Sequence, residues 1–222
     1  MFDFKSVPLP PYSRIEDIVN SVTHAAGIPF VIVAAVMLLA KDGAQITGKY
    51  IAQVMIYAVS MFIVFFGSAF YHGLKPGYVK QVSRVVDHSN IFFMISGTLT
   101  GFYSFAVAPL NKPLAVGMIT AAWCVTAVGV FLTFMNQEKF KWVQLISYVA
   151  LGWSAVVGMV PIYKTGEAGK VFVWTVFAGG IMFTLGAVLY VIGKKKKYFH
   201  AVFHVFILFG AITMFIGMYR YI

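Results

Sequence analysis

The chain has 222 residues, of which 60% are hydrophobic and only 11% are charged. This balance departs far from that of a soluble globular protein and predicts a membrane protein. The formal net charge of +10 belongs to short segments between apolar runs, so it indicates anionic lipid headgroups rather than nucleic acid as partners. The single cysteine, Cys124, lies inside an apolar run, and an internal disulfide is therefore excluded.

The apolar runs are long enough to cross a bilayer, which takes about 20 mostly apolar residues in a helix. Seven runs follow one another with short connections, at 22–40, 50–72, 86–110, 113–135, 142–162, 171–193 and 199–219. We therefore predict an all-α fold, a bundle of seven transmembrane helices that forms a single membrane domain over residues 1–222. A soluble helical protein with a large core is the alternative, and seven consecutive runs argue against it.

Residues 1–21 precede the first run and form an N-terminal segment of different composition. They contain three prolines and three acidic residues, unlike the short basic start of a cleaved signal peptide. Ser13 is suited to cap a helix. Apolar residues follow it at helical spacing, namely Ile15, Ile18, Val19 and Val22. We expect a short cytoplasmic helix lying on the membrane interface, with an extended lead-in as the alternative.

The lysines and arginines predict the orientation of the bundle. If the N-terminus is cytoplasmic, the segments on that side carry eleven lysines and arginines, and those on the other side carry six. Four of the eleven form one run, Lys194 to Lys197. The positive-inside rule then places the N-terminus inside and the C-terminus outside. A reporter fused after Ile222 is expected outside the cytoplasm, and one inserted near Lys196 inside.

A few ionisable residues interrupt the apolar runs, and in this topology they meet at one membrane face. His72 ends the second span, Asp87 and His88 open the third, and His200 and His204 open the seventh. All five histidines of the chain fall at that face. Ionisable side chains are costly at membrane depth and stay there when they pair, bind a metal or line a polar cavity. The convergence therefore predicts a metal site.

Helical spacing narrows the set of candidate ligands. His200 and His204 are four residues apart and share a helix face, so both can bind one ion. His72 completes a three-histidine set, and three protein ligands plus a water are the arrangement of catalytic zinc. Asp87 is then the candidate proton acceptor for that water. Ser68 shares a face with His72 and is the candidate to orient the water or an imidazole.

Each of these residues also has a structural interpretation. A histidine pair near a helix end is often only interfacial, and Asp87 can pair with Arg84 three residues earlier. Ser68 alone indicates close helix packing. A carboxylate and three imidazoles at one depth favour the metal site. His24 and His88 are excluded as ligands; His88 points about 100° away from Asp87 around the helix.

Four motifs resemble those of hemolysin III-like proteins, the bacterial branch of the progestin and adipoQ receptor family, which is distantly similar to alkaline ceramidases. The motifs are Glu16-Asp17-Ile18-Val19-Asn20-Ser21-Val22-Thr23-His24, Ser68-x3-His72, Asp87-His88-Ser89 and His200-x3-His204. The resemblance covers all seven spans. It implies an inside N-terminus and a zinc ion near the cytoplasmic face, held by His72, His200 and His204. Ser68 and Asp87 match the accessory polar residues of the family, with Asp87 reaching zinc through water.

The resemblance implies two competing functions for a multi-pass protein of the cell membrane. One is a zinc-dependent hydrolase that cleaves an acyl or amide bond of a lipid held among the helices. The other is a non-enzymatic sensor or regulator in which structural zinc joins the second and seventh spans. The resemblance implies a role in membrane lipid or energy homeostasis, within which the hydrolase is the first candidate and the regulator the alternative. A pore-forming haemolysin is the least favoured, because polar residues gather at only one end. With about twenty residues before the first span, we expect no cytosolic signalling domain.

Overall fold

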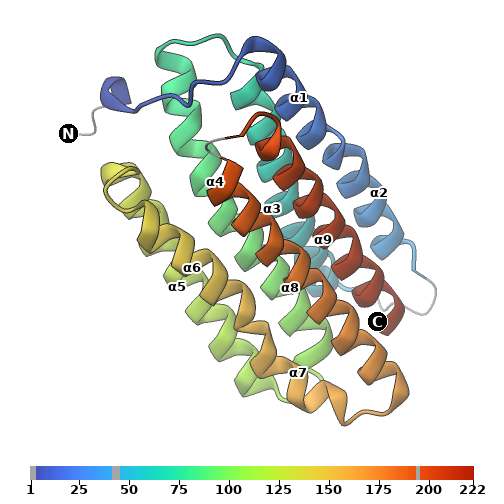
Figure 1. Cartoon of the computed structure of the whole chain (residues 1–222). Coiled ribbons are helices and arrows are strands. Elements are labelled where there is room, and N and C mark those ends of the chain that lie inside the picture. The colour runs from blue at the N-terminus through green and yellow to red at the C-terminus, as the bar shows by residue number, and fades with distance from the viewer. Residues whose placement is uncertain (1–3, 42–45, 194–195) are drawn as a thin grey trace.

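The computed structural model describes residues 4–41, 46–193 and 196–222, and within these ranges every regular element is helical. The elements are η1 (Phe4–Ser6), α1 (Arg14–Ala25), α2 (Gly27–Leu39), α3 (Gly48–Gly73), α4 (Tyr78–Phe102), η2 (Tyr103–Val107), α5 (Lys112–Asn136), α6 (Lys141–Trp153), α7 (Ala155–Tyr163), α8 (Glu167–Gly193) and α9 (Phe199–Tyr221). Figure 1 shows a bundle of long helices, with the N-terminal stretch crossing one end and the C-terminus at the other.

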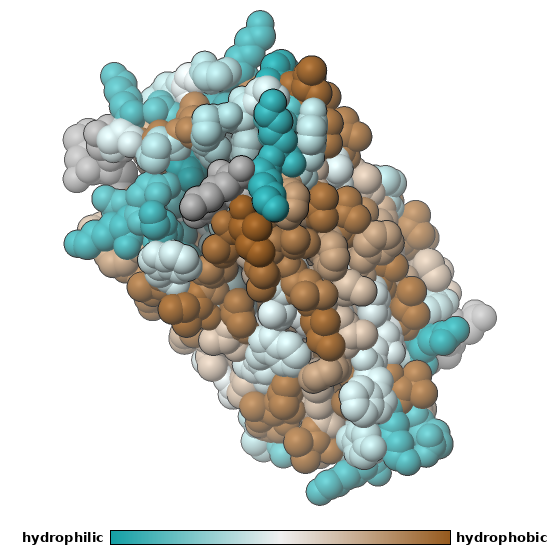
Figure 2. All heavy atoms as spheres, viewed as in Figure 1, coloured by the Kyte–Doolittle hydropathy of each residue, from teal (hydrophilic) through white to brown (hydrophobic). Residues whose placement is uncertain are grey.

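Seven helical segments of the described chain are long and apolar enough to cross a membrane. They are Arg14–Leu39, Gly48–Gly73, Tyr78–Val107, Lys112–Asn136, Lys141–Tyr163, Glu167–Ile192 and Phe199–Tyr221. Hydrophobic side chains cover the middle of the face in Figure 2, and hydrophilic ones gather at its two ends. Large apolar residues of these segments are exposed, for example Phe66, Ile146 and Trp174, which suits a lipid environment. The predicted seven-span helical bundle is confirmed.

The orientation of this bundle in the membrane stays a prediction. Within the basic run that contributes most to the charge bias, Lys194 and Lys195 lie outside the described residues.

The third span begins earlier than the sequence predicted. Its helix starts at Tyr78 instead of residue 86, because Lys80 and Arg84 are buried inside the bundle and their charge does not mark a solvated loop. Asp87 therefore lies nine residues into α4, about 13 Å along the helix axis, and does not open the span. The helix continues through the π-helical turn η2 to Val107.

The helix predicted over Ser13 to Ser21 exists as α1, and the alternative of an extended lead-in is wrong. The helix runs on to Ala25 and forms one span-length segment with α2, Arg14–Leu39. Ser13 begins it through a capping box: the Ser13 hydroxyl accepts from the Glu16 amide, and the Glu16 carboxylate accepts from the Ser13 amide. The helix packs against α3 and α9 and leads into α2 (Figure 1). Its depth relative to the membrane interface stays a prediction.

The faces of α1 are arranged opposite to those of a helix in a soluble protein. Its apolar residues Ile15, Ile18 and Val22 are exposed, whereas a polar face is buried against the bundle. That face consists of Glu16, Asp17, Asn20 and His24. A helix that faces lipid on one side and a polar site on the other has this arrangement.

The centre of the bundle is formed by α3 and α4, which approach closely through small residues. A Cβ atom added at Gly97 of α4 would lie only 1.7 Å from the Ser60 hydroxyl of α3. A Cβ atom added at Gly129 of α5 would likewise collide with the Phe92 ring of α4. Close backbone approach through small residues is typical of packing between membrane helices. These contacts fix the two helices that carry His72, Ser68 and Asp87.

Candidate metal centre

The structure brings together three imidazoles from two helices, which we call the histidine cluster: His72, His200 and His204. His72 is the penultimate residue of α3, and His200 and His204 lie one turn apart at the start of α9. Their ligand atoms all lie within 4.8 Å of one another, and the Nε2 atoms of His72 and His200 are 3.1 Å apart. The predicted convergence of these histidines is confirmed.

Hydrogen bonds fix the ring orientation of two of the histidines. Nδ1 of His72 lies 3.1 Å from a carboxylate oxygen of Asp17, and Nδ1 of His204 lies 3.1 Å from the backbone carbonyl of Asn20. Ionised carboxylate and carbonyl oxygens only accept, so each Nδ1 carries the proton and donates it. Nε2 of both rings is consequently left with a free lone pair, the form of histidine that binds metal.

These residues fit a zinc ion. Two nitrogens bound tetrahedrally to zinc at its usual bond length lie about 3.3 Å apart, close to the 3.1 Å between His72 and His200. Carboxylate and carbonyl partners on the far ring nitrogens are also typical of histidines that bind zinc. Without an ion, the same 3.1 Å contact is a hydrogen bond donated by Nε2 of His200. The assignment of the three histidines as ligands stays a prediction.

Ser68 and Asp87 lie close to each other beside the histidine cluster. Ser68 lies one turn before His72 on α3, and its hydroxyl is within hydrogen-bonding reach of the Asp87 carboxyl on α4. Among the described residues, the group with ligand atoms within 4.8 Å contains no carboxylate, so Asp87 is placed beside the cluster and not in it. The alternative pairing with Arg84 is not formed. Arg84 donates to Glu138 at 2.9 Å and to the Pro8 carbonyl.

The two histidines excluded as ligands have different surroundings. Nδ1 of His88 lies 2.9 Å from the Arg84 carbonyl, and its Nε2 lies 3.3 Å from the Tyr190 hydroxyl. His24 is buried, with its ring centroid 3.6 Å from that of His204 and 5.5 Å from that of Phe65. Neither residue belongs to the group of side chains whose ligand atoms lie within 4.8 Å of one another, and their exclusion as ligands stays a prediction.

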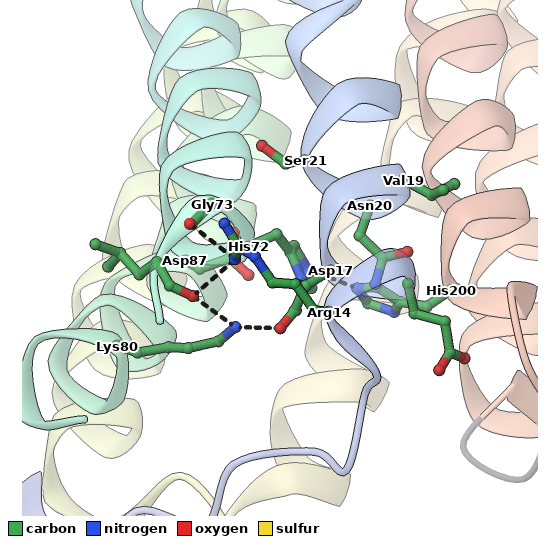
Figure 3. A network of polar contacts seen from close by, with 12 residues as sticks. Arg14, Asp17, Val19, Asn20, Ser21, His72, Gly73, Lys80, Asp87 and His200 are labelled. Carbon is green, nitrogen blue, oxygen red and sulfur yellow. Dashed lines mark hydrogen bonds and ion pairs between the residues drawn. The ribbon is translucent and has the colours of Figure 1, made fainter. Parts of the chain in front are cut away.

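Sequence reasoning assigned no role to the polar face of α1, which supports the cluster and lies mostly before the first predicted run. Asp17 lies against His72, and Lys80 of α4 donates to the same carboxylate (Figure 3). Thr23 accepts from Nδ1 of His204 at 3.1 Å, beside the Asn20 carbonyl. The available signal was the spacing of Asp17, Asn20 and His24, which recurs every three to four residues.

Residues 4–13, which precede α1, cross the end of the bundle over the cluster. Gln81 donates to the carbonyls of Lys5 and Val7 at 2.8 and 3.1 Å and holds the segment on α4. The Tyr12 ring stacks on His200, with centroids 5.5 Å apart, and lies 5.9 Å from His72. Burial raises the pKa of Tyr12 above its usual value, so a neutral phenol covers the imidazoles.

A cavity of about 210 Å³ begins at the cluster and runs into the bundle. Its polar end includes Ser68, Asp87, His200 and His204. Three charged residues, Arg84, Glu138 and Lys141, also line it. The remainder of its wall is largely apolar and comes mainly from α4, α6, α8 and α9, including Leu99, Phe102, Trp153, Phe172, Ile207 and Met218. The cluster is therefore approached from inside the bundle, whereas Tyr12 covers it at the bundle end.

These observations define a multi-pass membrane protein with a polar, histidine-rich centre at one end of its helical bundle. Comparison with known proteins identifies the family. The profile described as haemolysin-III related matches residues 12–215, so the chain belongs to that family. The resemblance seen in the four sequence motifs is confirmed.

Three relatives illustrate the range of this family. Hemolysin-3 of Bacillus cereus is 27% identical over 209 residues, which cover 93% of this chain and 92% of the relative. The Hemolysin-3 homolog of Bacillus subtilis is 28% identical over 200 residues, covering 90% and 91%. The monocyte to macrophage differentiation factor of Homo sapiens is 24% identical over 215 residues, covering 93% and 84%. The similarity therefore extends over nearly the whole chain.

Proposed function

We propose that this protein is a zinc-dependent membrane hydrolase that cleaves an acyl or amide bond of a lipid and acts in membrane lipid and energy homeostasis. The observation that carries the proposal is the joining of a three-histidine cluster to a largely apolar cavity within a membrane bundle. An apolar site with a few polar groups at one end is the usual form of a binding site for a small amphipathic ligand.

The shape of the cavity suits an extended hydrocarbon chain. On α9 its lining residues run from His200 to Met218, eighteen residues or about 27 Å of helix. A chain lying against Phe172 and Met218 would present its headgroup linkage to the polar end, beside Ser68 and Asp87.

The roles of the residues follow from their placement. Zinc, when bound, supplies a Lewis acid that activates water and polarises a carbonyl group. Asp87 is positioned to accept the proton of an attacking water, and the Ser68 hydroxyl holds the carboxyl in place. The neutral Tyr12 ring covers the bundle end, and the apolar part of the cavity wall lowers the polarity around a substrate chain.

A non-enzymatic regulator is the second candidate. The cluster joins α3 to α9, so structural zinc would fix these helices relative to each other and make their packing sensitive to metal. The complete burial of His72 favours this alternative, because a closed structural site shields its ligands. A pore is disfavoured, since the cavity wall beyond Asp87 is mostly apolar.

Replacement of Asp87 by Asn separates the two candidates. In a hydrolase, Asp87→Asn keeps zinc bound but lowers lipid cleavage by about 10²-fold or more, the scale of a lost general base. The measurement is release of fatty acid from a panel of ceramides and other acyl lipids in liposomes, with zinc determined on the same samples. If zinc-loaded wild type releases no fatty acid from any lipid of the panel, the hydrolase is rejected and the regulator is retained.

A further inference from the structure

The two buried histidines of the cluster are oriented by different parts of α1. His204 donates to a backbone carbonyl, that of Asn20, which every side-chain substitution leaves in place. His72 instead donates to a side chain, the carboxylate of Asp17. Both partners of this second contact are buried, with His72 entirely inaccessible to solvent and Asp17 5% exposed. His204 therefore keeps a backbone acceptor whatever side chain replaces its second partner, Thr23, whereas the orientation of His72 depends on the Asp17 side chain.

The Asp17 carboxylate is held from two sides. Its Oδ1 faces Nδ1 of His72 at 3.1 Å, and its Oδ2 accepts from Nζ of Lys80 at 2.5 Å. Lys80 also donates to the Leu74 carbonyl and lies over the Tyr71 ring. Figure 3 shows Asp17 of α1 linked to His72 on α3 and to Lys80 on α4. Each oxygen has its own partner, and the charge of the buried carboxylate is balanced by the lysine.

We propose that Asp17 is a positioning residue of the metal centre, which fixes the Nδ1–H tautomer of His72, directs its Nε2 toward His200 and thereby sets the affinity for zinc. A carboxylate on the far nitrogen orients a ligating imidazole and makes it a stronger donor. The proposal rests on the zinc site of the proposed function and is independent of whether a lipid is cleaved.

Asp17 and Asp87 have different tasks in this arrangement. Asp17 contacts an imidazole and is not among the residues that line the cavity, whereas Asp87 contacts Ser68 and lines the cavity. Replacing Asp17 is therefore expected to change metal binding, and replacing Asp87 to change proton transfer with the metal retained.

Zinc affinity tests the positioning role, by competition with a fluorescent chelator on detergent-solubilised protein. Asp17→Ala and Asp17→Asn are expected to weaken zinc binding 10- to 100-fold, the usual effect of losing such a partner. Glu16→Gln is the matched control: Glu16 is also a buried carboxylate of α1, but it bonds to Ser13 and contacts no imidazole of the cluster. Its zinc affinity is expected to equal that of wild type.

Nitrogen-15 NMR of the histidine rings separates positioning from a merely structural ion pair. In zinc-loaded wild type, Nδ1 of His72 is expected to be protonated and hydrogen-bonded. In Asp17→Ala this signature changes for His72 and persists for His204, whose acceptor is the backbone. Equal loss of affinity in Glu16→Gln, or an unchanged His72 signature in Asp17→Ala, overturns the proposal.

A double variant covers the case in which Asp17→Ala fails to fold because Lys80 is left buried and unpaired. Asp17→Asn combined with Lys80→Met removes both charges of the pair together. Weak zinc binding by the folded double variant supports the positioning role, and wild-type affinity overturns it, as does a wild type that binds no zinc. A zinc-loaded wild type that cleaves no lipid rejects only the hydrolase.

Discussion

The same two helices, α3 and α4, behave differently at the end of the bundle and in its middle. At the end they carry His72, Lys80 and Asp87, and each of these ionisable groups contacts another polar side chain. In the middle, Gly97 and Ser60 let the two backbones approach. Ionisable groups inside a membrane bundle persist when they pair, and here the paired ones of α3 and α4 lie at one end. Close packing stabilises the middle, so substitutions in the two regions are expected to have separable effects.

The largest expected effect is loss of metal at the end of the bundle. His204→Ala removes one of three ligands and is expected to reduce bound zinc from about one ion per chain to nearly none. His88→Ala is the control, because His88 bonds to Arg84 and Tyr190 outside the cluster and should keep its zinc. Elemental analysis of purified protein measures both. Equal loss of zinc in the two variants, or no zinc in wild type, contradicts the three-histidine assignment.

The next effect concerns stability in the middle of the bundle. Gly97→Ala places a methyl group against Ser60 and is expected to destabilise the fold by about 1–3 kcal/mol, as overpacking does, without changing zinc affinity. Gly117→Ala is the matched control, since nothing lies within 4 Å of a Cβ at Gly117 and alanine favours a helix. Unfolding in detergent measures the difference. Equal stability of the two variants would show that the close contact contributes little.

The smallest effect concerns access to the cluster from the bundle end. Tyr12→Ala removes the ring stacked on His200 and is expected to speed zinc extraction by a water-soluble chelator severalfold, with the initial zinc content unchanged. Tyr78→Ala provides the control, because Tyr78 is an exposed tyrosine at the start of α4. Identical extraction rates in both variants and wild type would show that Tyr12 does not cover the site.

The sequence predicted the elements with a strong local pattern. Runs of apolar residues located all seven spans, and the four-residue spacing of His200 and His204, with the alternating direction of the spans, predicted their meeting with His72. The same reasoning started the third span eight residues late, because Lys80 and Arg84 are polar residues that face inward. Hydropathy measures the polarity of a segment and not the direction in which its side chains point.

The tertiary fold decides which residue a buried polar side chain contacts, so the local sequence pattern does not predict that partner. Asp17 meets His72 across 55 positions of sequence, and His204 meets Asn20 across 184. The apolar residues of α1 predicted a helix on the membrane surface. Its opposite, polar face is the one that contacts the histidine cluster. For the same reason, sequence reasoning offered Asp87 as a partner of Arg84 and did not predict the contact with Glu138.

The separation of the histidines along the chain has a consequence for biosynthesis. His72 and His200 are 128 positions apart, so at usual translation rates roughly 6–26 s pass between their synthesis. In that interval α1 and α3 are already made, and Asp17 has its imidazole partner within reach. The cluster closes only when α9 joins the bundle. A nascent chain that stalls before its last helix therefore lacks the complete cluster, and its formation marks the end of assembly.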